Sequence, residues 1–401
     1  MLSSQRKYLG RMVLTAASVL VGLGVSESIA RFVSPADYAC MVFNAPDAEP
    51  SGLFGFQPPL GMMLTPGFEG DFRIPGHRVS LRVNSLGMRG PEPSGTAPGF
   101  RWLAIGDSFT LSLQVPEEET FVARLSLALR EEVLNGGVSG DSTWQSTERY
   151  RRWAPAVQPN AVLLVFFVGN DLNDDAAFDR DGLRGGRAGP GPGGDPPPGS
   201  GAQPGGVAIP PPIDAPVEPT WKRALVPRRL TRWLLQHSYL WSHIRVAVER
   251  RAVAAGTPER VARWKGELGI YTRAGRPLLE RLAPATRDAL ADLQRATRER
   301  QDDLVVALAP PLFAVDRERL PATFDLVGLD PSDADLDAPT AVVQGILDGL
   351  GVASCDLTPA LRAAHDAGNE TYLAYDAHWS PAGHAVVAEA LYDCILGHRR
   401  R

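Results

Sequence analysis

The chain has 401 residues, of which 44% are hydrophobic, so it can form one large domain or two ordinary ones around a substantial core. Its 41 basic and 46 acidic residues give a net charge of −5, which offers no reason to expect a nucleic-acid-binding protein. Three cysteines, Cys40, Cys355 and Cys394, are too few and too scattered for a disulfide framework or a metal knuckle. One disulfide between Cys355 and Cys394, which would suit an exported chain, and two buried thiols are both compatible with the sequence. The sequence has no phosphate-binding glycine loop and no credible set of metal ligands, so we expect no cofactor and no metal.

The amino terminus predicts a membrane helix. Basic residues precede an uncharged apolar run at 12–25, the pattern of a signal peptide or a signal anchor. The run is shorter than the roughly 20 residues that a bilayer span prefers, but the i,i+4 spacing of Glu27 and Arg31 would let the helix continue. Residues 28–30 form only a fair cleavage site. We therefore expect residues 1–33 to be an uncleaved single-pass anchor, with the rest of the chain extracytoplasmic. A cleaved, secreted protein and a cytosolic amphipathic helix are the alternatives.

Alternating strands and helices predict the main domain. Residues 34–99 are rich in Pro and Gly and contain short alternating pieces, which predicts a small β-rich lead-in. Apolar runs then predict buried strands at 102–105, 133–134, 161–168, 304–308 and 352–356. Helical spacing predicts helices between them, at 118–132, 143–153, 283–300, 341–350 and 382–396. This order is typical of an α/β domain, here over 100–396, whose parallel sheet is covered on both faces.

Two insertions are expected to interrupt this domain. Residues 182–219 include GPGPGGDPPPGSG and little that could be buried, which predicts a disordered segment. From Leu230 onward, apolar residues such as Trp233 and Trp241 share one helical stripe, which predicts a helical insertion at about 221–280. The stripe is expected to pack into the core. The alternative is a lid that grips an acyl or glycan group.

Small or polar residues follow three of the predicted strands. Ser108, Gly140 and Asn170 each lie just beyond a strand, and all carboxyl ends of a parallel sheet lie at one edge. A hydroxyl nucleophile needs a base and donors for the oxyanion. The backbone N–H groups of Ser108 and Gly140 and the side-chain amide of Asn170 could supply those donors, although Gly136 and Gly137 compete with Gly140.

The base must be one of seven histidines. His378 is the candidate, because it lies in a turn before the last helix and Asp376 precedes it by two residues. His384, at the start of that helix, is expected to be a packing residue, and Trp379 a core or pocket-wall aromatic.

Four sequence blocks resemble the SGNH (GDSL-like) hydrolases, in the order of that family. These are GDSFT at 106–110, NGGVSGDS at 135–142, GND at 169–171 and DAHWSPAGH at 376–384. The stretch RVNSLGMRGPEP, before the first block, looks like the corresponding stretch of membrane-anchored bacterial members. The resemblance covers roughly residues 100–180 and 300–396. It implies a flavodoxin-like three-layer sandwich with a parallel sheet.

The resemblance also implies a role for each candidate residue. Ser108 would be the nucleophile, Ser108, Gly140 and Asn170 would form the oxyanion hole, and His378 would be the base, oriented by Asp376. The usual last block has the Asp three residues before the His, whereas this chain has Tyr375 there. The D-x-H-W form is similar to that of SGNH-type polysaccharide O-acetyltransferases.

These observations predict a serine esterase that removes an acyl group from an envelope glycan, lipid or small-molecule ester through an acyl-enzyme. An O-acyltransferase acting on a polysaccharide is the nearest alternative, and a non-catalytic glycan-binding or assembly protein is the alternative of another class. Activity is expected to fall as His378 is protonated, near its ordinary pKa of about 6.5 or somewhat above it if Asp376 raises that pKa. The sequence names no protein partner.

Overall fold

A computed structural model describes most of the chain. The described residues are 2–32, 52–57, 60–74, 77–95, 99–181, 238, 240–241, 244, 258–373 and 377–400. The predicted disordered insertion at 182–219, most of the predicted helical stripe, the first part of the lead-in and Asp376 lie outside these residues. The predictions made for those segments therefore stay predictions.

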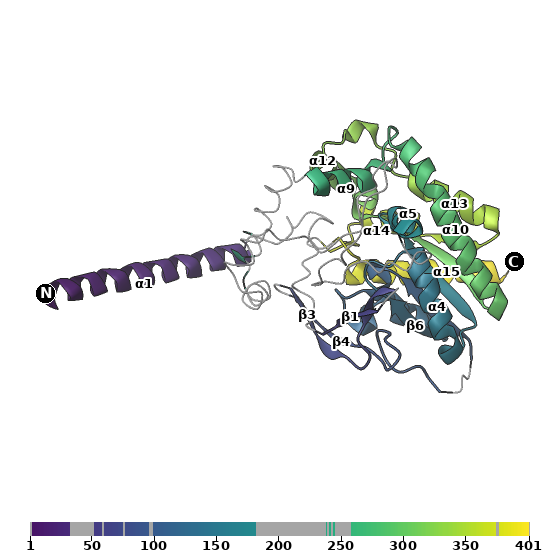
Figure 1. Ribbon diagram of the computed structural model, residues 1–401, viewed down its shortest axis with the longest axis horizontal. Helices are drawn as coiled ribbons and strands as arrows, with labels where there is room; N and C mark the ends of the chain where they lie inside the picture. Colours follow the sequence, from purple (N-terminus) through teal and green to yellow (C-terminus); the bar gives the residue numbers. More distant parts are fainter. Residues whose placement is uncertain are drawn as a thin grey trace.

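The first element is a single long helix, α1 (Leu2–Phe32). Residues 12–30 of α1 are long and apolar enough to cross a membrane by length and composition. Their apolar side chains, including Leu14, Leu20 and Leu23, are exposed, and α1 extends away from the α/β body in Figure 1. A signal peptide has the same features, so α1 agrees with the anchor and with its cleaved alternative.

The lead-in consists of two antiparallel hairpins. The first pairs β1 (Phe54–Gln57) with β2 (Gly61–Leu64), and the second pairs β3 (Glu69–Ile74) with β4 (His77–Arg82). Their inward side chains form a small core with two residues of the main domain, Leu111 and Leu113. The lead-in is therefore packed against the segment that follows the first strand of the main sheet.

The main sheet has five strands in the order β6-β5-β7-β8-β9, with every neighbouring pair parallel. Its strands are β5 (Arg101–Gly106), β6 (Glu132–Gly137), β7 (Ala161–Phe167), β8 (Asp303–Ala309) and β9 (Ala353–Asp356). Numbered within the sheet, the order is 2-1-3-4-5, that of flavodoxin-like doubly wound sheets. The predicted α/β fold with a parallel sheet is confirmed.

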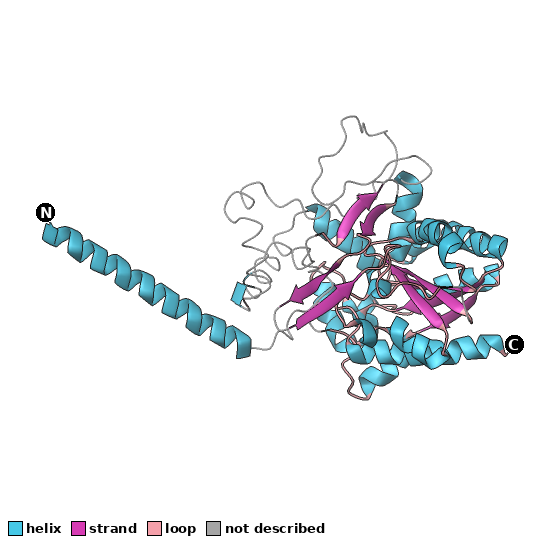
Figure 2. Cartoon of the chain, turned by 90° about the horizontal axis from the view of Figure 1, so that it is seen from below, coloured by secondary structure: helices cyan, strands magenta, loops and turns pink. Residues whose placement is uncertain are grey.

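Helices cover both faces of this sheet (Figures 1 and 2). Leu103 and Ile105 of β5 face one core, whereas Trp102 and Ala104 face the other, because side chains alternate along a strand. The longer helices are α3 (Phe121–Leu129), α4 (Thr143–Val157), α5 (Asp171–Asp181), α9 (Pro258–Gly269), α10 (Arg276–Arg300), α13 (Ala338–Leu350), α14 (Thr358–Asp366) and α15 (Pro381–Arg399). Side chains of α4, α5, α10 and α13 fill the first core, and those of α3 and α15 fill the second. The result is a three-layer sandwich.

Two predicted boundaries differ from the structure for identifiable reasons. The helix predicted at 118–132 is shorter, because Thr120 caps α3 by accepting a hydrogen bond from the Ala123 N–H. The strand predicted at 133–134 continues to Gly137, since Gly136 and Gly137 allow β6 to pack closely against its neighbours.

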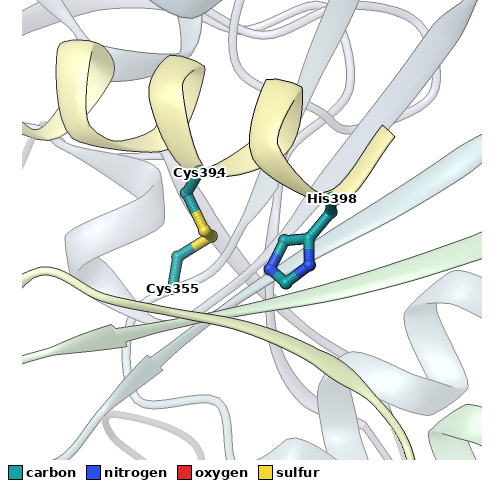
Figure 3. Close-up of side chains that lie close together, drawn as sticks. All are labelled: Cys355, Cys394 and His398. Carbon is teal, nitrogen blue, oxygen red and sulfur yellow. A yellow bond between two sulfur atoms is a disulfide. The ribbon is translucent and has the colours of Figure 1, made fainter. Parts of the chain in front are cut away.

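A disulfide joins Cys355 on β9 to Cys394 on α15, so the structure selects one of the two alternatives that the sequence left open (Figure 3). Among the described residues, Cys355, Cys394 and His398 also form a trio with the spacing of metal ligands. Their two sulfur atoms are bonded to each other, so they are not thiolate ligands. The His398 Nε2 lies 3.1 Å from the Ser354 carbonyl oxygen. Cys355 and Cys394 therefore form a covalent structural link, and His398 contacts the backbone beside it.

Replacing both Cys355 and Cys394 by serine is expected to lower the free energy of unfolding. The disulfide closes a loop across a sequence separation of 39 residues, which corresponds to roughly 3–4 kcal/mol in the chain-entropy description. Urea unfolding of the double variant measures this difference. The wild-type protein in a reducing agent should show the same loss, and a midpoint that does not change in either experiment would contradict the expectation.

Candidate active site

Ser108 lies directly after the central strand β5 and begins the short helix α2 (Ser108–Leu111). The chain turns at Gly106, whose φ of +141° favours glycine. Asp107 then caps α2, because its carboxylate accepts a hydrogen bond of 2.9 Å from the Phe109 N–H. Ser108 is half-buried at the carboxyl edge of the sheet. This is where open α/β sheets place their ligands.

The structure brings His378 to Ser108 across 270 positions of sequence. The His378 Nε2 and the Ser108 Oγ are 2.8 Å apart, within hydrogen-bonding distance. The loop that carries His378 is closed at its ends, because the Leu373 N–H donates to the His378 carbonyl and the Ala377 N–H donates to the Leu373 carbonyl. Ser380 then caps α15 by accepting a hydrogen bond from the Gly383 N–H. These contacts hold the backbone that carries His378, and the His378 Nε2 lies within the reach that a general base needs.

Aromatic rings surround the imidazole. The Phe109 ring lies 4.8 Å from the His378 ring and stacks on Phe167, and Trp379 meets Phe109 edge-on. Trp379 is fully buried, as expected for a core aromatic. His384 is also buried and accepts a hydrogen bond from the Phe121 N–H, and burial lowers the pKa of His384 well below its usual value. His384 thus packs in the interior, as the sequence predicts, and its lowered pKa favours the neutral form.

The three glycines near the end of β6 have different surroundings. A Cβ at Gly136 would lie 2.9 Å from the Trp153 ring, and one at Gly137 would lie 2.3 Å from the Leu111 nitrogen. These two glycines are needed for close packing. Gly140 is exposed, has a φ of +76° and has open space where a Cβ would be. Of the three, Gly140 is therefore the one that a substrate could approach.

Asn170 follows β7, which neighbours β5 in the sheet, and begins the turn into α5. Its Nδ2 donates a hydrogen bond of 2.7 Å to the Asp174 carboxylate, which fixes the orientation of the amide. An amide nitrogen carries two N–H groups, and this contact uses one of them. The structure thus places Ser108, Gly140 and Asn170 after three adjacent strands. Asp376 lies outside the described residues, so its predicted contact with His378 stays a prediction.

Four buried carboxyl groups lie beneath this edge of the sheet. Burial raises the pKa of Asp107 and of Asp141 to about 6 and that of Asp175 to about 7, and burial with the nearby Asp107 raises the pKa of Asp171 well above its usual value. Asp141 is also paired with the buried Arg149, which favours its charged form. Burial therefore favours the protonated forms of Asp107, Asp171 and Asp175, whereas Arg149 opposes this effect at Asp141.

Asp175→Asn is expected to make stability less dependent on pH. The pKa of Asp175 is raised to about 7, so the folded state binds more protons than the unfolded state between about pH 4 and pH 7, and stability falls as the pH rises through that range. An asparagine can keep both contacts of Asp175, accepting from the Thr143 N–H and donating to the Thr143 hydroxyl. Urea unfolding of both proteins at pH 5 and pH 8 tests this. The variant should gain more stability over the wild type at pH 8 than at pH 5, and an equal difference at both values would contradict the expectation.

Gln114 and Arg89 are close to this site, and the sequence predicts no role for either of them. The Gln114 Nε2 lies 3.2 Å from the His378 Nδ1, and the Arg89 guanidinium contacts the backbone on both sides of Gln114. Both residues lie in or near recognisable sequence blocks, but nothing at either position in the sequence indicates a role in the site. Only the tertiary structure brings Gln114 to the imidazole and Arg89 to the backbone beside Gln114.

Comparison with known proteins agrees with the fold. Residues 273–399 match the family described as the SGNH hydrolase-like domain of the acetyltransferase AlgX. This match contains His378 but not the segment with Ser108. No protein among those with curated functions matches the chain.

Several solved structures are similar to the chain at low sequence identity. An acetylxylan esterase from Geobacillus stearothermophilus, Axe2, is 15% identical with a TM-score of 0.37, covering 75% of this chain and 96% of that one. The acetyl xylan esterase AlAXEase is 11% identical with a TM-score of 0.37, covering 74% and 100%. LAE5, an α/β hydrolase from the metagenome of Lake Arreo, Spain, is 15% identical with a TM-score of 0.36, covering 74% and 95%.

Proposed function

Because the chain carries an SGNH hydrolase-like domain, we propose that it is a serine enzyme that cleaves esters through an acyl-enzyme. The observation that carries this proposal is the 2.8 Å contact between the Ser108 Oγ and the His378 Nε2, made by residues 270 positions apart. A hydroxyl and an imidazole in this geometry are the minimal pair for nucleophilic acyl transfer.

The proposed reaction has two halves. In the first, the Ser108 Oγ attacks the ester carbonyl carbon while the His378 Nε2 takes the hydroxyl proton. The Ser108 N–H, the Gly140 N–H and the Asn170 amide stabilise the oxyanion. The tetrahedral intermediate then expels the alcohol, which receives the proton from His378. In the second half, His378 takes a proton from water, and the resulting hydroxide attacks the carbonyl carbon of the acyl-Ser108. The bond to the Ser108 Oγ then breaks, the Oγ takes the proton back from His378, and the carboxylic acid is released. Asp376 is proposed to orient the imidazole.

O-acetyl transfer to a sugar hydroxyl is the second candidate, favoured by two observations. The family matched over 273–399 is described by an acetyltransferase, and the matched segment includes the last block with its D-x-H-W form. In this version a sugar hydroxyl replaces water in the second half-reaction, so the acyl group leaves as a new ester of the sugar instead of a carboxylic acid. The substrate class proposed is therefore an acylated glycan, lipid or small-molecule ester.

We further propose that the domain lies outside the cytoplasm, anchored by α1. The Cys355–Cys394 disulfide supports this location, because disulfides form and persist in oxidising compartments. The apolar length of α1 supports an anchor, with cleavage and secretion as the alternative. Mass spectrometry of the intact protein, isolated from the membrane fraction and from the secreted fraction, distinguishes the two. A mass that includes α1 supports the anchor, and a mass without α1 supports cleavage.

The test of the proposed function uses the full chain in detergent with a chromogenic acetyl ester, with and without an oligosaccharide acceptor. Free acid as the only product supports the esterase, and an acetylated oligosaccharide found by mass spectrometry supports the transferase. Absence of turnover under both conditions would favour a non-catalytic binding or assembly protein. Ser108→Ala is measured in parallel so that background hydrolysis is subtracted.

The pH dependence of turnover is expected to show an acidic limb. The His378 Nε2 must be unprotonated to accept the Ser108 proton. The value of kcat/KM should therefore fall about tenfold for each pH unit below the pKa that this histidine has in the enzyme without substrate, which is ordinarily about 6.5. Measurement between pH 5 and pH 8 tests this, with unfolding followed over the same range as a control. A flat profile would contradict the role of His378 as base.

A further inference from the structure

We propose that Gln114 is a positioning residue that holds the His378 imidazole at Nδ1, and that the lead-in sets the place of Gln114 through Arg89. This inference rests on the proposed function, because it concerns the same imidazole. It adds to that function a structural task for the lead-in, whose described residues otherwise contribute no side chain to the proposed chemistry.

The first step of the argument is the contact itself. The Gln114 Nε2 lies 3.2 Å from the His378 Nδ1, and the Ser108 Oγ lies 2.8 Å from the Nε2 of the same ring. Both Gln114 and His378 are buried, at 5% and 8% exposure. A polar contact in this setting is little screened by water, so it constrains the ring more strongly than a surface contact would. Gln114 and Ser108 therefore hold opposite nitrogens of one imidazole.

The second step concerns the tautomer. If the Gln114 amide donates to Nδ1, the ring proton is on Nε2, and His378 cannot accept the Ser108 proton. If the amide is turned so that its Oε1 accepts from an Nδ1–H, the Nε2 lone pair faces the hydroxyl and His378 is ready as a base. The oxygen and nitrogen of an amide side chain exchange places by a rotation about the last side-chain bond. Gln114 can therefore hold either tautomer, and the proposed chemistry uses the one in which Oε1 accepts.

The third step is how Gln114 is held. Arg89, at the end of the lead-in, donates from Nη1 to the carbonyls of Leu111 and Ser112 and from Nη2 to that of Val115, so it grips the backbone on both sides of Gln114. Ser112 has a φ of 58°, a left-handed conformation that needs such support.

The anchoring of Arg89 is equally firm. Its backbone N–H donates to the Asn135 carbonyl of β6, and its side chain is 4% exposed. Burial lowers the pKa of Arg89 to about 10, so the guanidinium is charged at neutral pH and its hydrogen bonds are charge-assisted. The backbone that carries Gln114 is thus fixed from the lead-in.

The test compares Gln114→Ala and Gln114→Glu in the full chain, using the chromogenic ester. Gln114→Ala should lower kcat roughly 10- to 100-fold with KM unchanged, because a buried hydrogen bond to a group that becomes charged in the reaction is lost. Gln114→Glu should restore much of the rate, since a carboxylate also accepts from Nδ1–H. A negative charge there favours the imidazolium, so the acidic limb of kcat/KM should move to higher pH in Gln114→Glu. Asp107 and His384, titratable groups near His378 among the described residues, are unchanged in both variants, as is Asp376, the residue proposed to orient the imidazole.

Gln294→Ala is the matched control, because Gln294 is a largely buried glutamine on α10 that donates to the Leu350 carbonyl, away from the site. The folded fraction of each variant is counted by active-site labelling. The proposal would be overturned if both Gln114 variants kept the wild-type kcat per labelled site and the acidic limb of kcat/KM stayed at the wild-type pH. It would also be overturned if Gln114→Ala lost activity but Gln114→Glu neither restored kcat nor moved the acidic limb to higher pH. If Ser108→Ala retains full turnover, the proposed function has failed, whereas turnover that depends on Ser108 but not on Gln114 refutes this inference alone.

Discussion

Ser108→Ala is expected to abolish both ester turnover and labelling by a fluorophosphonate probe. The substitution removes the Oγ that lies 2.8 Å from the His378 Nε2, so no acyl-enzyme can form. Loss of a nucleophile of this kind lowers kcat by about 10⁴-fold or more, with the remaining activity coming from binding and the oxyanion donors alone. Gel detection of a fluorescent fluorophosphonate, together with hydrolysis of the chromogenic ester, measures both effects on the same samples.

Ser146→Ala provides the control for this experiment. Ser146 is a buried serine on α4 whose hydroxyl has no hydrogen-bond partner among the described residues, so its removal should leave stability and labelling nearly unchanged. Labelling of Ser108→Ala at the level of Ser146→Ala would show that another residue reacts, and the assignment of Ser108 would be wrong. Loss of labelling in both variants would point to misfolding, which thermal unfolding of each variant detects.

Most of the fold follows from local patterns in the sequence. The three central strands, β5, β7 and β8, contain continuous apolar runs because both faces of the sheet are covered, and this pattern predicts their places and their parallel arrangement. The helix boundaries are less predictable, since they depend on individual caps such as Thr120. The strand Glu132–Gly137 extends past its apolar residues because its glycines fit against neighbouring elements, which no local pattern encodes.

The candidate site also contains residues that the sequence predicts and contacts that it does not. Ser108, Gly140, Asn170 and His378 stand in sequence blocks whose spacing indicates a shared chemistry, so the sequence alone is enough to propose them. The pairing of Cys355 with Cys394 is only one of two alternatives at that level, because spacing alone does not bring two thiols together. The contact of Gln114 with His378 spans 264 positions, so no local pattern encodes it. Contacts of that kind are set by tertiary structure.

Gly106→Ala is expected to cost a large share of the stability of the domain. The φ of Gly106 is +141°, a region that side chains rarely adopt, and a Cβ there would lie 2.5 Å from both the Val165 carbonyl oxygen and the Thr110 Oγ1. Backbone strain and overpacking each cost about 1–3 kcal/mol, so the sum of roughly 2–6 kcal/mol compares with a typical total of about 5–15 kcal/mol. Relief of the clash requires β5 and β7 to separate just before Ser108. We therefore expect the variant to lose active-site labelling together with its cooperative unfolding transition, followed by circular dichroism in urea.

Gly140→Ala distinguishes the cost of backbone strain from the cost of a steric clash, because only the strain is present at Gly140. Gly140 also has a positive φ, +76°, but a Cβ there would have no atom within 4 Å, so only the conformational cost of roughly 1–2 kcal/mol applies. This variant should fold and unfold cooperatively, while its turnover falls because the new methyl group stands where the oxyanion is proposed to approach the backbone. Equal losses of stability in the two variants would show that the packing at Gly106 is not what holds the chain beneath Ser108. A Gly106→Ala protein with wild-type labelling would contradict the close approach of β5 and β7 at that point.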